Sequence, residues 1–369
     1  MSIYEEIGMQ RLVNARSIVG RFGDSLMSQA VIDAMNDAAK SHVYMADLRQ
    51  NIHRQLAELT DNEAAMVCSG AACGGMLAVA ACMTGLDEDK KNRLPNTDSM
   101  RNEVIMHKKG RWPEDVSIRP TGVTIREIGG SSRKAMKSEL EQTITDRTAA
   151  ILMCSFDKKT VIPLDLAVAM GKDHGVPVII DGAYTIPPKE NLWYFTKEMG
   201  ADLAIFSGGK ALRGPASTGL VVGRKDLIEA CELNNRYNQG IGFSCKVGKE
   251  ELVGIFVAIR NLVKRDEEAI TKGFLSRIEN LKRQLTIFPF LRFETTEHGF
   301  WGDDFGLHIF FEDGRESVKD IVVGACRNQN PPIEVGVRRD HVYICLSVLN
   351  PADDDLVASR LLDAINKAM

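Results

Sequence analysis

A lysine among glycines is the residue of this sequence best suited to covalent chemistry. Lys210 follows Ser207, Gly208 and Gly209, directly after an apolar run at residues 202–206. Apolar neighbours that keep water away lower the pKa of an amine, and a neutral amine can attack an aldehyde to form an imine. The sequence therefore predicts an imine-forming amine at Lys210. The alternative is an ordinary solvated lysine in a glycine-rich loop.

A carboxylate lies 29 residues before this lysine. Asp181 ends the apolar run at 176–180 and is followed by Gly182, Ala183 and Tyr184. At the end of a strand, an aspartate often caps a turn or a helix. It can equally pair with the N–H of a protonated heteroaromatic ring and keep that nitrogen charged.

Small residues from Ser69 to Gly75 precede an apolar helical run at 76–83. Small residues at the start of a helix let the backbone N–H groups approach an anion, and the helix dipole favours negative charge there. The segment matches neither of the common glycine-rich nucleotide motifs, and tight packing alone could explain it. Together with Asp181 and Lys210, however, it meets the requirements for holding pyridoxal phosphate: an anion cup, a carboxylate for the ring nitrogen and an amine.

The elements that must position these groups are those of a wound α/β domain. Residues 60–225 alternate apolar runs with amphipathic stretches, and a helix is predicted over 164–174 that stops at Gly175. Ligands of open α/β sheets bind at the carboxyl ends of the strands, where all three segments are expected. Strands are predicted at 104–106, 123–125, 149–154, 176–180, 202–206 and 219–222.

Changes in character along the chain predict four parts. These are an N-terminal arm at 1–45, a large α/β domain at 46–245, a connecting helix at 246–284 and a small α+β domain at 285–369. The connecting helix is inferred from a long charged stretch with helical periodicity, and the small domain from alternating strands and helices.

Composition indicates a soluble, cytoplasmic protein. The 369 residues include 46 Lys+Arg and 50 Asp+Glu, a formal charge of −4, which disfavours broad nucleic-acid binding. None of the eight cysteines forms a CxxC pair, so we expect reduced core residues and no metal site. The N-terminus is acidic, and no apolar run approaches the roughly 20 residues of a membrane helix.

Several stretches resemble the selenocysteine-synthase-like branch of the fold type I pyridoxal-phosphate enzymes. The resemblance implies the aspartate aminotransferase-like fold, with a mainly parallel mixed sheet in the large domain and a smaller C-terminal α+β domain. It also implies a homodimer or higher homo-oligomer, because such enzymes place their active sites between subunits. Where the branch usually has an SRGE-like stretch, this chain reads HKKGRW at 107–112, which complicates the transfer of substrate specificity. The similar stretches are residues 8–15, 56–65, 69–72, 174–181 and 207–210.

Carried over to matching positions, the resemblance implies a role for each candidate. Lys210 would bond to the cofactor and then move protons at the substrate Cα, and Asp181 would hydrogen-bond the ring nitrogen. His107 would stack on the ring or transfer protons; the alternative is a partly exposed histidine in a basic loop. Ser155 would approach the ring hydroxyl, unless it merely forms a turn. The phosphate would be held by the amides of Gly70, Ala71 and Ala72, with a hydroxyl from Ser69 or Ser207.

An acidic substrate needs cationic anchors, and arginine forms a bidentate fork with carboxylate or phosphate. One candidate cluster contains Lys108 and Arg111, and another contains Arg338 and Arg339. Arg16 is a further candidate. For each of these residues, an exposed or structural charge is the alternative.

The implied reaction is that of a pyridoxal-phosphate-dependent ammonia-lyase. It would convert D-glucosaminate 6-phosphate to 2-keto-3-deoxy-6-phosphogluconate and ammonia by α,β-elimination. The nearest rival is a selenocysteine synthase, the selenium transferase that acts on L-seryl-tRNA, although the acidic chain and the early start of the cofactor domain disfavour it. Another pyridoxal-phosphate-dependent amino-acid lyase or racemase, or a non-catalytic regulator with a vestigial site, also stays open. A nicotinamide-dependent dehydrogenase is disfavoured because the glycine fingerprint is lacking.

Overall fold

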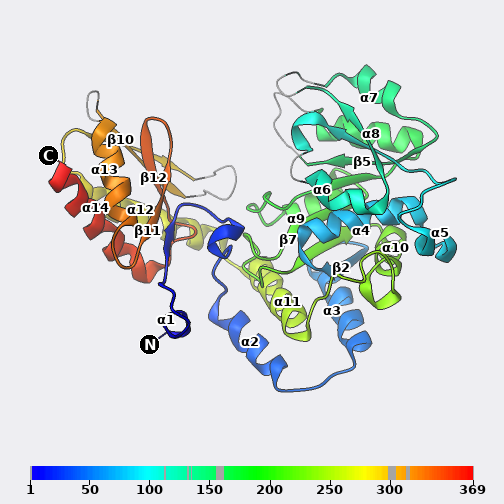
Figure 1. Cartoon of the computed structure of the whole chain (residues 1–369), viewed down its shortest axis with the longest axis horizontal. Helices are drawn as coiled ribbons and strands as arrows, with labels where there is room; N and C mark the ends of the chain where they lie inside the picture. The colour runs from blue at the N-terminus through cyan, green and yellow to red at the C-terminus, as the bar shows by residue number, and fades with distance from the viewer. Residues whose placement is uncertain are drawn as a thin grey trace. The chain divides into compact units, whose positions relative to one another are not determined.

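A mixed, mostly parallel sheet forms the centre of the larger part of the protein (Figure 1). The computed structural model describes residues 2–111, 114–130, 133, 135–154, 162–297, 305–312 and 316–368. Within these residues, seven strands lie in the order β2-β8-β7-β6-β5-β3-β4. The strands from β7 through β6, β5 and β3 to β4 are parallel neighbours, whereas β8 runs antiparallel to both β7 and β2. The prediction of an α/β domain with a mainly parallel mixed sheet is confirmed. The strands are β2 (Ala64–Cys68), β3 (Glu103–His107), β4 (Thr124–Ile128), β5 (Thr148–Met153), β6 (Val178–Asp181), β7 (Leu203–Ser207) and β8 (Gly219–Gly223).

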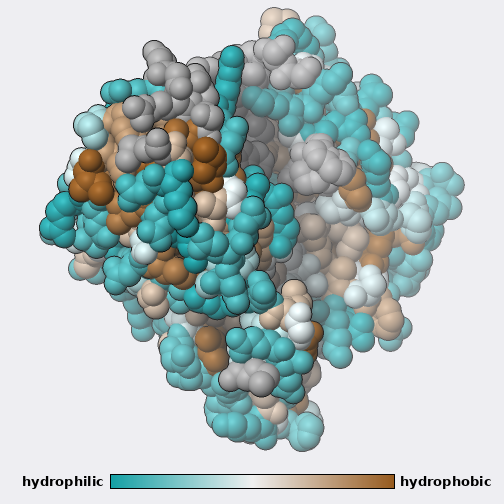
Figure 2. Space-filling view, turned by 60° about the vertical axis from the view of Figure 1, so that its left-hand side comes forward, coloured by the Kyte–Doolittle hydropathy of each residue, from teal (hydrophilic) through white to brown (hydrophobic). Residues whose placement is uncertain are grey.

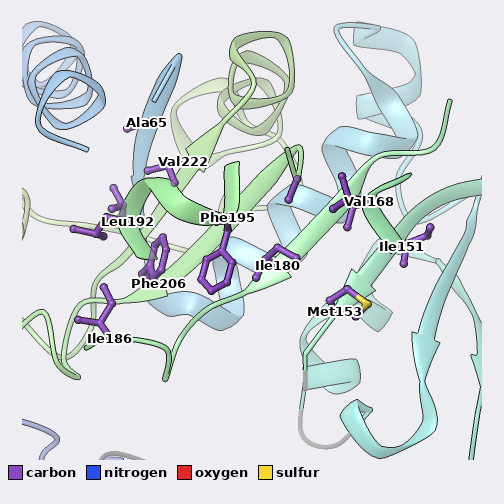
Figure 3. Close-up of a cluster of buried hydrophobic side chains, with 14 of the residues drawn as sticks. Ala65, Ile151, Met153, Val168, Ile180, Ile186, Leu192, Phe195, Phe206 and Val222 are labelled. Atoms are coloured by element: carbon purple, nitrogen blue, oxygen red, sulfur yellow. The ribbon is translucent and has the colours of Figure 1, made fainter. Parts of the chain in front are cut away.

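Side chains on the two faces of this sheet enter different hydrophobic clusters, as expected from the two-residue period of a strand. Ile180 and Phe206 belong to one cluster, which Figure 3 shows together with Phe195. Their neighbours Ile179 and Ile205 belong to the other. Strands buried on both faces read as continuous apolar runs, which is why the sequence identifies them.

Helices cover both faces. On one side α4 and α10 contribute to the cluster that contains Ile179, and on the other side α3, α8 and α11 contribute to the cluster that contains Ile180. The helices of this unit are α2 (Gln29–Ala39), α3 (Met45–Leu59), α4 (Gly70–Thr84), α5 (Glu88–Arg93), α6 (Glu114–Ile118), α7 (Lys137–Thr143), α8 (Leu164–His174), α9 (Asn191–Trp193), α10 (Lys225–Leu233) and α11 (Lys249–Lys264). Single turns lie at η2 (Lys108–Gly110), η3 (Arg119–Thr121), η4 (Tyr194–Glu198) and η5 (Arg236–Asn238).

A second, smaller unit has its own sheet and core. Among the described residues its five strands lie in the order β1-β11-β12-β10-β9, and only β1 and β11 are parallel. The strands are β1 (Val13–Ala15), β9 (Leu291–Thr296), β10 (Gly306–Phe311), β11 (Ile333–Val337) and β12 (His341–Cys345). The helices are α1 (Ile3–Glu6), α12 (Glu267–Leu285), α13 (Glu316–Arg327) and α14 (Asp354–Ala368), with single turns at η1 (Gly20–Phe22) and η6 (Pro351–Asp353).

The boundaries of the two units differ from the four predicted parts. One unit is Met27–Lys264, and the other combines Met1–Leu26 with Arg265–Met369. The predicted arm at 1–45 is divided because Val13 pairs with Ile333 of the small sheet, whereas Val31 packs against Val257 of the large unit. The predicted helix at 246–284 is two helices, because Asp266 caps the N-terminus of α12 by accepting a hydrogen bond from the backbone of Ala269, 3.0 Å away.

Hydrophilic residues cover most of the face drawn in Figure 2, with hydrophobic residues in small groups between them. In the part of the chain that the structure describes, no helix combines the length and the apolar character needed to cross a membrane. The same residues hold no group of three or more His, Cys, Asp or Glu side chains arranged to bind a metal ion. No disulfide links any of the eight cysteines.

Candidate active site

Strand register brings the predicted site residues to one edge of the large sheet. Cys68, Gly219 and Ser207 lie side by side across β2, β8 and β7. Asp181 lies opposite Ile205, two residues before the end of β7. Because β2, β3, β5, β6 and β7 all run in the same direction, their carboxyl ends meet at this edge. The segments that follow Cys68, Asp181 and Ser207 are therefore neighbours, as the sequence predicts.

The start of α4 and the start of β8 approach each other very closely. Gly70 has a φ of +78°, a left-handed conformation that glycine adopts without strain. A Cβ atom at Gly219 would lie 2.6 Å from the carbonyl carbon of Gly70 and 2.8 Å from the nitrogen of Ala71. Only glycine fits there, so the first turn of α4 is held against the sheet with its leading N–H groups at the strand edge.

The first N–H groups of a helix have no partner within the helix, and together with the dipole they bind anions. Ser69 occupies the N-cap of α4, but its hydroxyl makes no capping hydrogen bond. The hydroxyl of Ser69 and the amides of Gly70, Ala71 and Ala72 lie at this helix start, and their role in holding a phosphate stays a prediction.

Asp181 ends β6 with a carboxylate that is largely withdrawn from water. Burial raises its pKa above the ordinary value, while the N–H of Ala183 and the positive charge of Lys210 act in the opposite direction. Among the described residues, the carboxylate accepts one hydrogen bond, from the backbone of Ala183 at 3.0 Å. A buried carboxylate with remaining acceptor capacity suits a cationic N–H partner.

Lys210 lies on a tight loop that follows β7. The backbone N–H of Gly208 donates to Thr218 at 2.7 Å, and that of Gly214 donates to Gly208 at 2.8 Å, which closes the loop on itself. The Nζ atom of Lys210 is 2.9 Å from the centre of the Tyr184 ring. The lysine side chain therefore contacts the turn that follows Asp181.

Tyr184 is a site residue that the sequence argument missed. The available signal was an aromatic side chain three residues after a carboxylate at a strand end, but nothing local indicated that it would meet Lys210. That contact depends on the pairing of β6 with β7.

His107 is buried, with 6% of its surface exposed, so the alternative of a partly exposed histidine is wrong. Its Nδ1 accepts a hydrogen bond from the backbone N–H of Lys109 at 3.1 Å. The proton of the neutral ring is then on Nε2. A Cβ atom at Gly129 would lie 2.1 Å from Nε2, so this nitrogen faces the backbone that follows β4.

The basic residues after β3 belong to an ion-pair network. Arg111 donates to Asp115 at 2.6 Å and also to Glu127, and Lys108 lies 4.0 Å from Glu127. Asp115 is bound by Arg119 as well, at 2.8 Å. These carboxylates compete with any substrate anion for Arg111 and Lys108.

The other predicted substrate anchors belong to the smaller unit. Arg16 lies 3.9 Å from Glu334, and the guanidinium of Arg338 lies 4.7 Å from the centre of the Tyr343 ring. Arg339 follows Arg338 at the end of β11 and is exposed. Ser155 falls outside the described residues.

The described residues of the large unit fit pyridoxal phosphate. The close packing of Gly70 against Gly219 fixes the start of α4, whose first N–H groups can bind an anion, Asp181 suits a ring N–H, and Lys210 supplies the amine. Ser207 ends β7 in the same row as Cys68, with Gly219 of β8 between them.

Adding a methyl group at Gly219 is expected to distort this cup. Gly219→Ala forces the backbone of Gly70 to move, so we expect at least a tenfold weaker affinity for pyridoxal phosphate and a loss of about 1–3 kcal/mol in the free energy of unfolding. Titration of the apoprotein by absorbance and thermal melting measure the two effects. Gly273→Ala is the matched control, because a Cβ there meets nothing within 4 Å. Unchanged affinity in Gly219→Ala would contradict the proposed cup.

Comparison with known proteins agrees with this geometry. The aminotransferase class-V model matches residues 25–236. A 5′-C-glycyluridine monooxygenase-decarboxylase from Streptomyces is 35% identical over 316 residues, covering 83% of this chain and 75% of the relative. A D-glucosaminate-6-phosphate ammonia lyase from Salmonella typhimurium is 32% identical over 267 residues, covering 70% of each chain.

An L-seryl-tRNA(Sec) selenium transferase from Geobacter metallireducens is 26% identical over 247 residues, and the match spans 50% of its length. Among solved structures, a D-glucosaminate-6-phosphate ammonia-lyase superposes with a TM-score of 0.86 at 24% identity, covering 100% of this chain and 99% of that one. That match shows the type I fold. Solved relatives of this fold carry pyridoxal phosphate, and the chain is a pyridoxal-phosphate-dependent enzyme. It belongs to the aminotransferase class-V family, in the part related to selenocysteine synthases.

Proposed function

We propose that this enzyme is an ammonia-lyase that converts D-glucosaminate 6-phosphate to 2-keto-3-deoxy-6-phosphogluconate and ammonia. The observation that carries the proposal is the 32% identity to a lyase named for this substrate, spread over 70% of the chain. The arrangement of Asp181, Lys210 and the start of α4 supports it, because these groups can hold the cofactor on which the reaction depends.

Each of these residues has a distinct task. When bound, the cofactor supplies an electron sink for the negative charge that develops at the substrate Cα. Lys210 would act as the general base that takes the Cα proton. Asp181 would keep the ring nitrogen protonated, and the amides at the start of α4 would hold the cofactor phosphate in place.

Lys210 can also act as the general acid in the step that expels the hydroxyl group. The substrate loses hydrogen at Cα and hydroxyl at the next carbon, so the ammonium of Lys210 can return the proton to the departing hydroxyl as water forms. The released enamine tautomerises, and water then replaces the nitrogen, which leaves as ammonia. The net products are ammonia and a 2-keto-3-deoxy sugar acid that retains the phosphate.

Three further parts of the proposal concern the substrate anchors, the assembly and the compartment. Arg338, Arg339, Arg16, Lys108 and Arg111 are proposed to bind the acidic groups of the substrate. Arg16, Lys108 and Arg111 would do so in competition with the carboxylates that they already contact. We propose a homodimer or larger homo-oligomer in the cytoplasm, a compartment in which cysteines stay reduced.

Ammonia release tests the proposed reaction. The purified enzyme with pyridoxal phosphate is expected to release ammonia and a 2-keto acid in equal amounts from D-glucosaminate 6-phosphate. D-glucosaminate and D-serine, which lack the phosphate, serve as comparison substrates and are expected to react at least about tenfold more slowly, the effect of one lost charged contact. Absence of ammonia from the phosphorylated acid would contradict the proposal.

A second candidate follows from the 35% identity to a monooxygenase-decarboxylase, which exceeds the identity to the lyase. Such an enzyme would consume oxygen and release carbon dioxide from an α-amino acid joined to a nucleoside. Oxygen uptake with 5′-C-glycyluridine, combined with no ammonia from the sugar acid, would favour this function.

A further inference from the structure

The contact between Lys210 and Tyr184 joins two turns that are both anchored to the sheet. The Nζ atom of Lys210 lies over the face of the ring, 2.9 Å from its centre. The turn that carries Tyr184 is fixed because the N–H of Gly182 donates to Ile205 of β7 at 2.8 Å. The same turn is closed by the N–H and hydroxyl of Thr185, which donate to Gly182 at 3.0 and 2.9 Å.

An ammonium group over the face of an aromatic ring is attracted by the negative charge density of that face. The attraction acts on the protonated amine and not on the neutral one. It therefore favours the charged form of Lys210 and restrains its Nζ at one place. The carboxylate of Asp181 also interacts electrostatically with Lys210, but Asp181 lies at the end of β6 and acts irrespective of the ring.

We propose that Tyr184 is a positioning residue for Lys210. The face of the Tyr184 ring holds the ammonium of Lys210 whenever this amine is not bonded to the cofactor. The proposal rests on the assignment of Lys210 as the cofactor-binding and proton-transferring amine. It applies to two states, the apoprotein and the stage after the substrate amine has displaced the lysine. In the second state, Lys210 has become an ammonium by taking the Cα proton. The ring stabilises this ammonium until the leaving hydroxyl accepts the proton.

The same contact must slow the capture of the cofactor, by which we mean the formation of the covalent bond between Lys210 of the apoprotein and the cofactor aldehyde. Capture requires the neutral amine, because its lone pair attacks the aldehyde carbon while water leaves. A ring that favours the ammonium lowers the fraction of neutral amine. Removing the ring should therefore speed capture by the apoprotein, although it impairs turnover.

Two substitutions separate the ring face from the hydroxyl. Tyr184→Phe keeps the face, and Tyr184→Leu removes it with a side chain of comparable apolar character. Tyr194→Leu is the matched control, because Tyr194 lies in the same unit and is exposed to a similar extent, 37% against 39% for Tyr184. Apoprotein of each variant is mixed with pyridoxal phosphate at neutral pH, samples are reduced with borohydride, and the label at Lys210 is quantified by peptide mass spectrometry.

We expect Tyr184→Leu to capture the cofactor about threefold faster than the parent, a factor typical of a cation–π contact at a partly exposed site. Tyr184→Phe and Tyr194→Leu should match the parent, and kcat should fall in Tyr184→Leu but not in Tyr184→Phe. Capture by Tyr184→Leu at the parent rate or below, or equal changes in the Leu and Phe variants, would overturn the proposal. Label at another lysine in the parent would instead overturn the assignment of Lys210. Melting curves of the apoproteins establish that each variant is folded.

Discussion

Replacing Lys210 with alanine is expected to abolish the covalent attachment of the cofactor and to lower turnover by at least about a thousandfold. The substitution removes both the amine that bonds to the cofactor and the general base at Cα, and a general base alone contributes about 10²–10⁴. The absorbance of the bound cofactor before and after borohydride, together with ammonia release, measures the two losses. Added primary amines are expected to restore part of the activity, because they can replace the missing base.

Lys225→Ala is the matched control for this experiment. Lys225 begins α10, its side chain is 71% exposed, and its Nζ lies 3.9 Å from Glu229. Its removal should change neither cofactor attachment nor turnover. Turnover by Lys210→Ala within about tenfold of the parent would contradict the roles given to Lys210, since a lost general base costs more than that.

Asp181→Asn is expected to reduce turnover by about 10²–10³, the usual effect of removing one electrostatic group from a reacting centre. The amide keeps the shape of the side chain but not the charge that keeps the ring nitrogen protonated. Cofactor affinity should fall as well, whereas the covalent bond to Lys210 should still form. Kinetics of ammonia release and absorbance titration test both points, and unchanged turnover would contradict the assignment.

The same substitution should stabilise the apoprotein at neutral pH. Burial raises the pKa of Asp181 in the folded chain, so the folded apoprotein binds this proton more tightly than the unfolded chain does. The resulting stability is present below the ordinary aspartate pKa of about 3.9 and is lost as the pH rises through the folded value. Above the folded pKa, the parent therefore contains a carboxylate charge withdrawn from water that the asparagine variant lacks.

Melting temperatures of the two apoproteins across pH test this point. Asp181→Asn should melt higher than the parent at pH 7, and the difference should shrink as the pH falls towards 4. With pyridoxal phosphate present the order should reverse, because a ligand stabilises the folded state that binds it more tightly. Asp146, which is exposed, provides the control substitution to asparagine. An apoprotein difference that is absent at pH 7 would contradict the burial argument.

Local patterns in the sequence were enough to locate the elements of the large sheet. The helix predicted over 164–174 is α8, and it ends at Gly175 in the left-handed conformation, with φ of 62°. The buried strands β5, β6 and β7 correspond to continuous apolar runs, because helices cover both faces of the sheet. Asp181 and Ser207 were predicted at strand ends, and both are the last residues of their strands.

Contacts between distant residues decided what these patterns could not. The arm at 1–45 reads as one segment, yet β1 joins a strand more than 300 residues away and leaves α2 with the other unit. Lys108 and Arg111 read as a basic cluster, but Glu127 and Asp115 neutralise much of their charge after folding. For His107 the sequence leaves open a partly exposed position in a basic loop, but the ring is buried where β3 pairs with β4.

By itself, the sequence determined the order of the strands and helices along the chain, the type of sheet and the chemical groups at its carboxyl edge. These properties depend on side-chain type and on periodicity over a few neighbouring residues. Only the tertiary structure decided where the chain divides into units, which charges are paired, and that the ring of Tyr184 receives the ammonium of Lys210. The physical reason is that strand pairing and burial are set by the summed packing of residues far apart in the sequence, which no local pattern records.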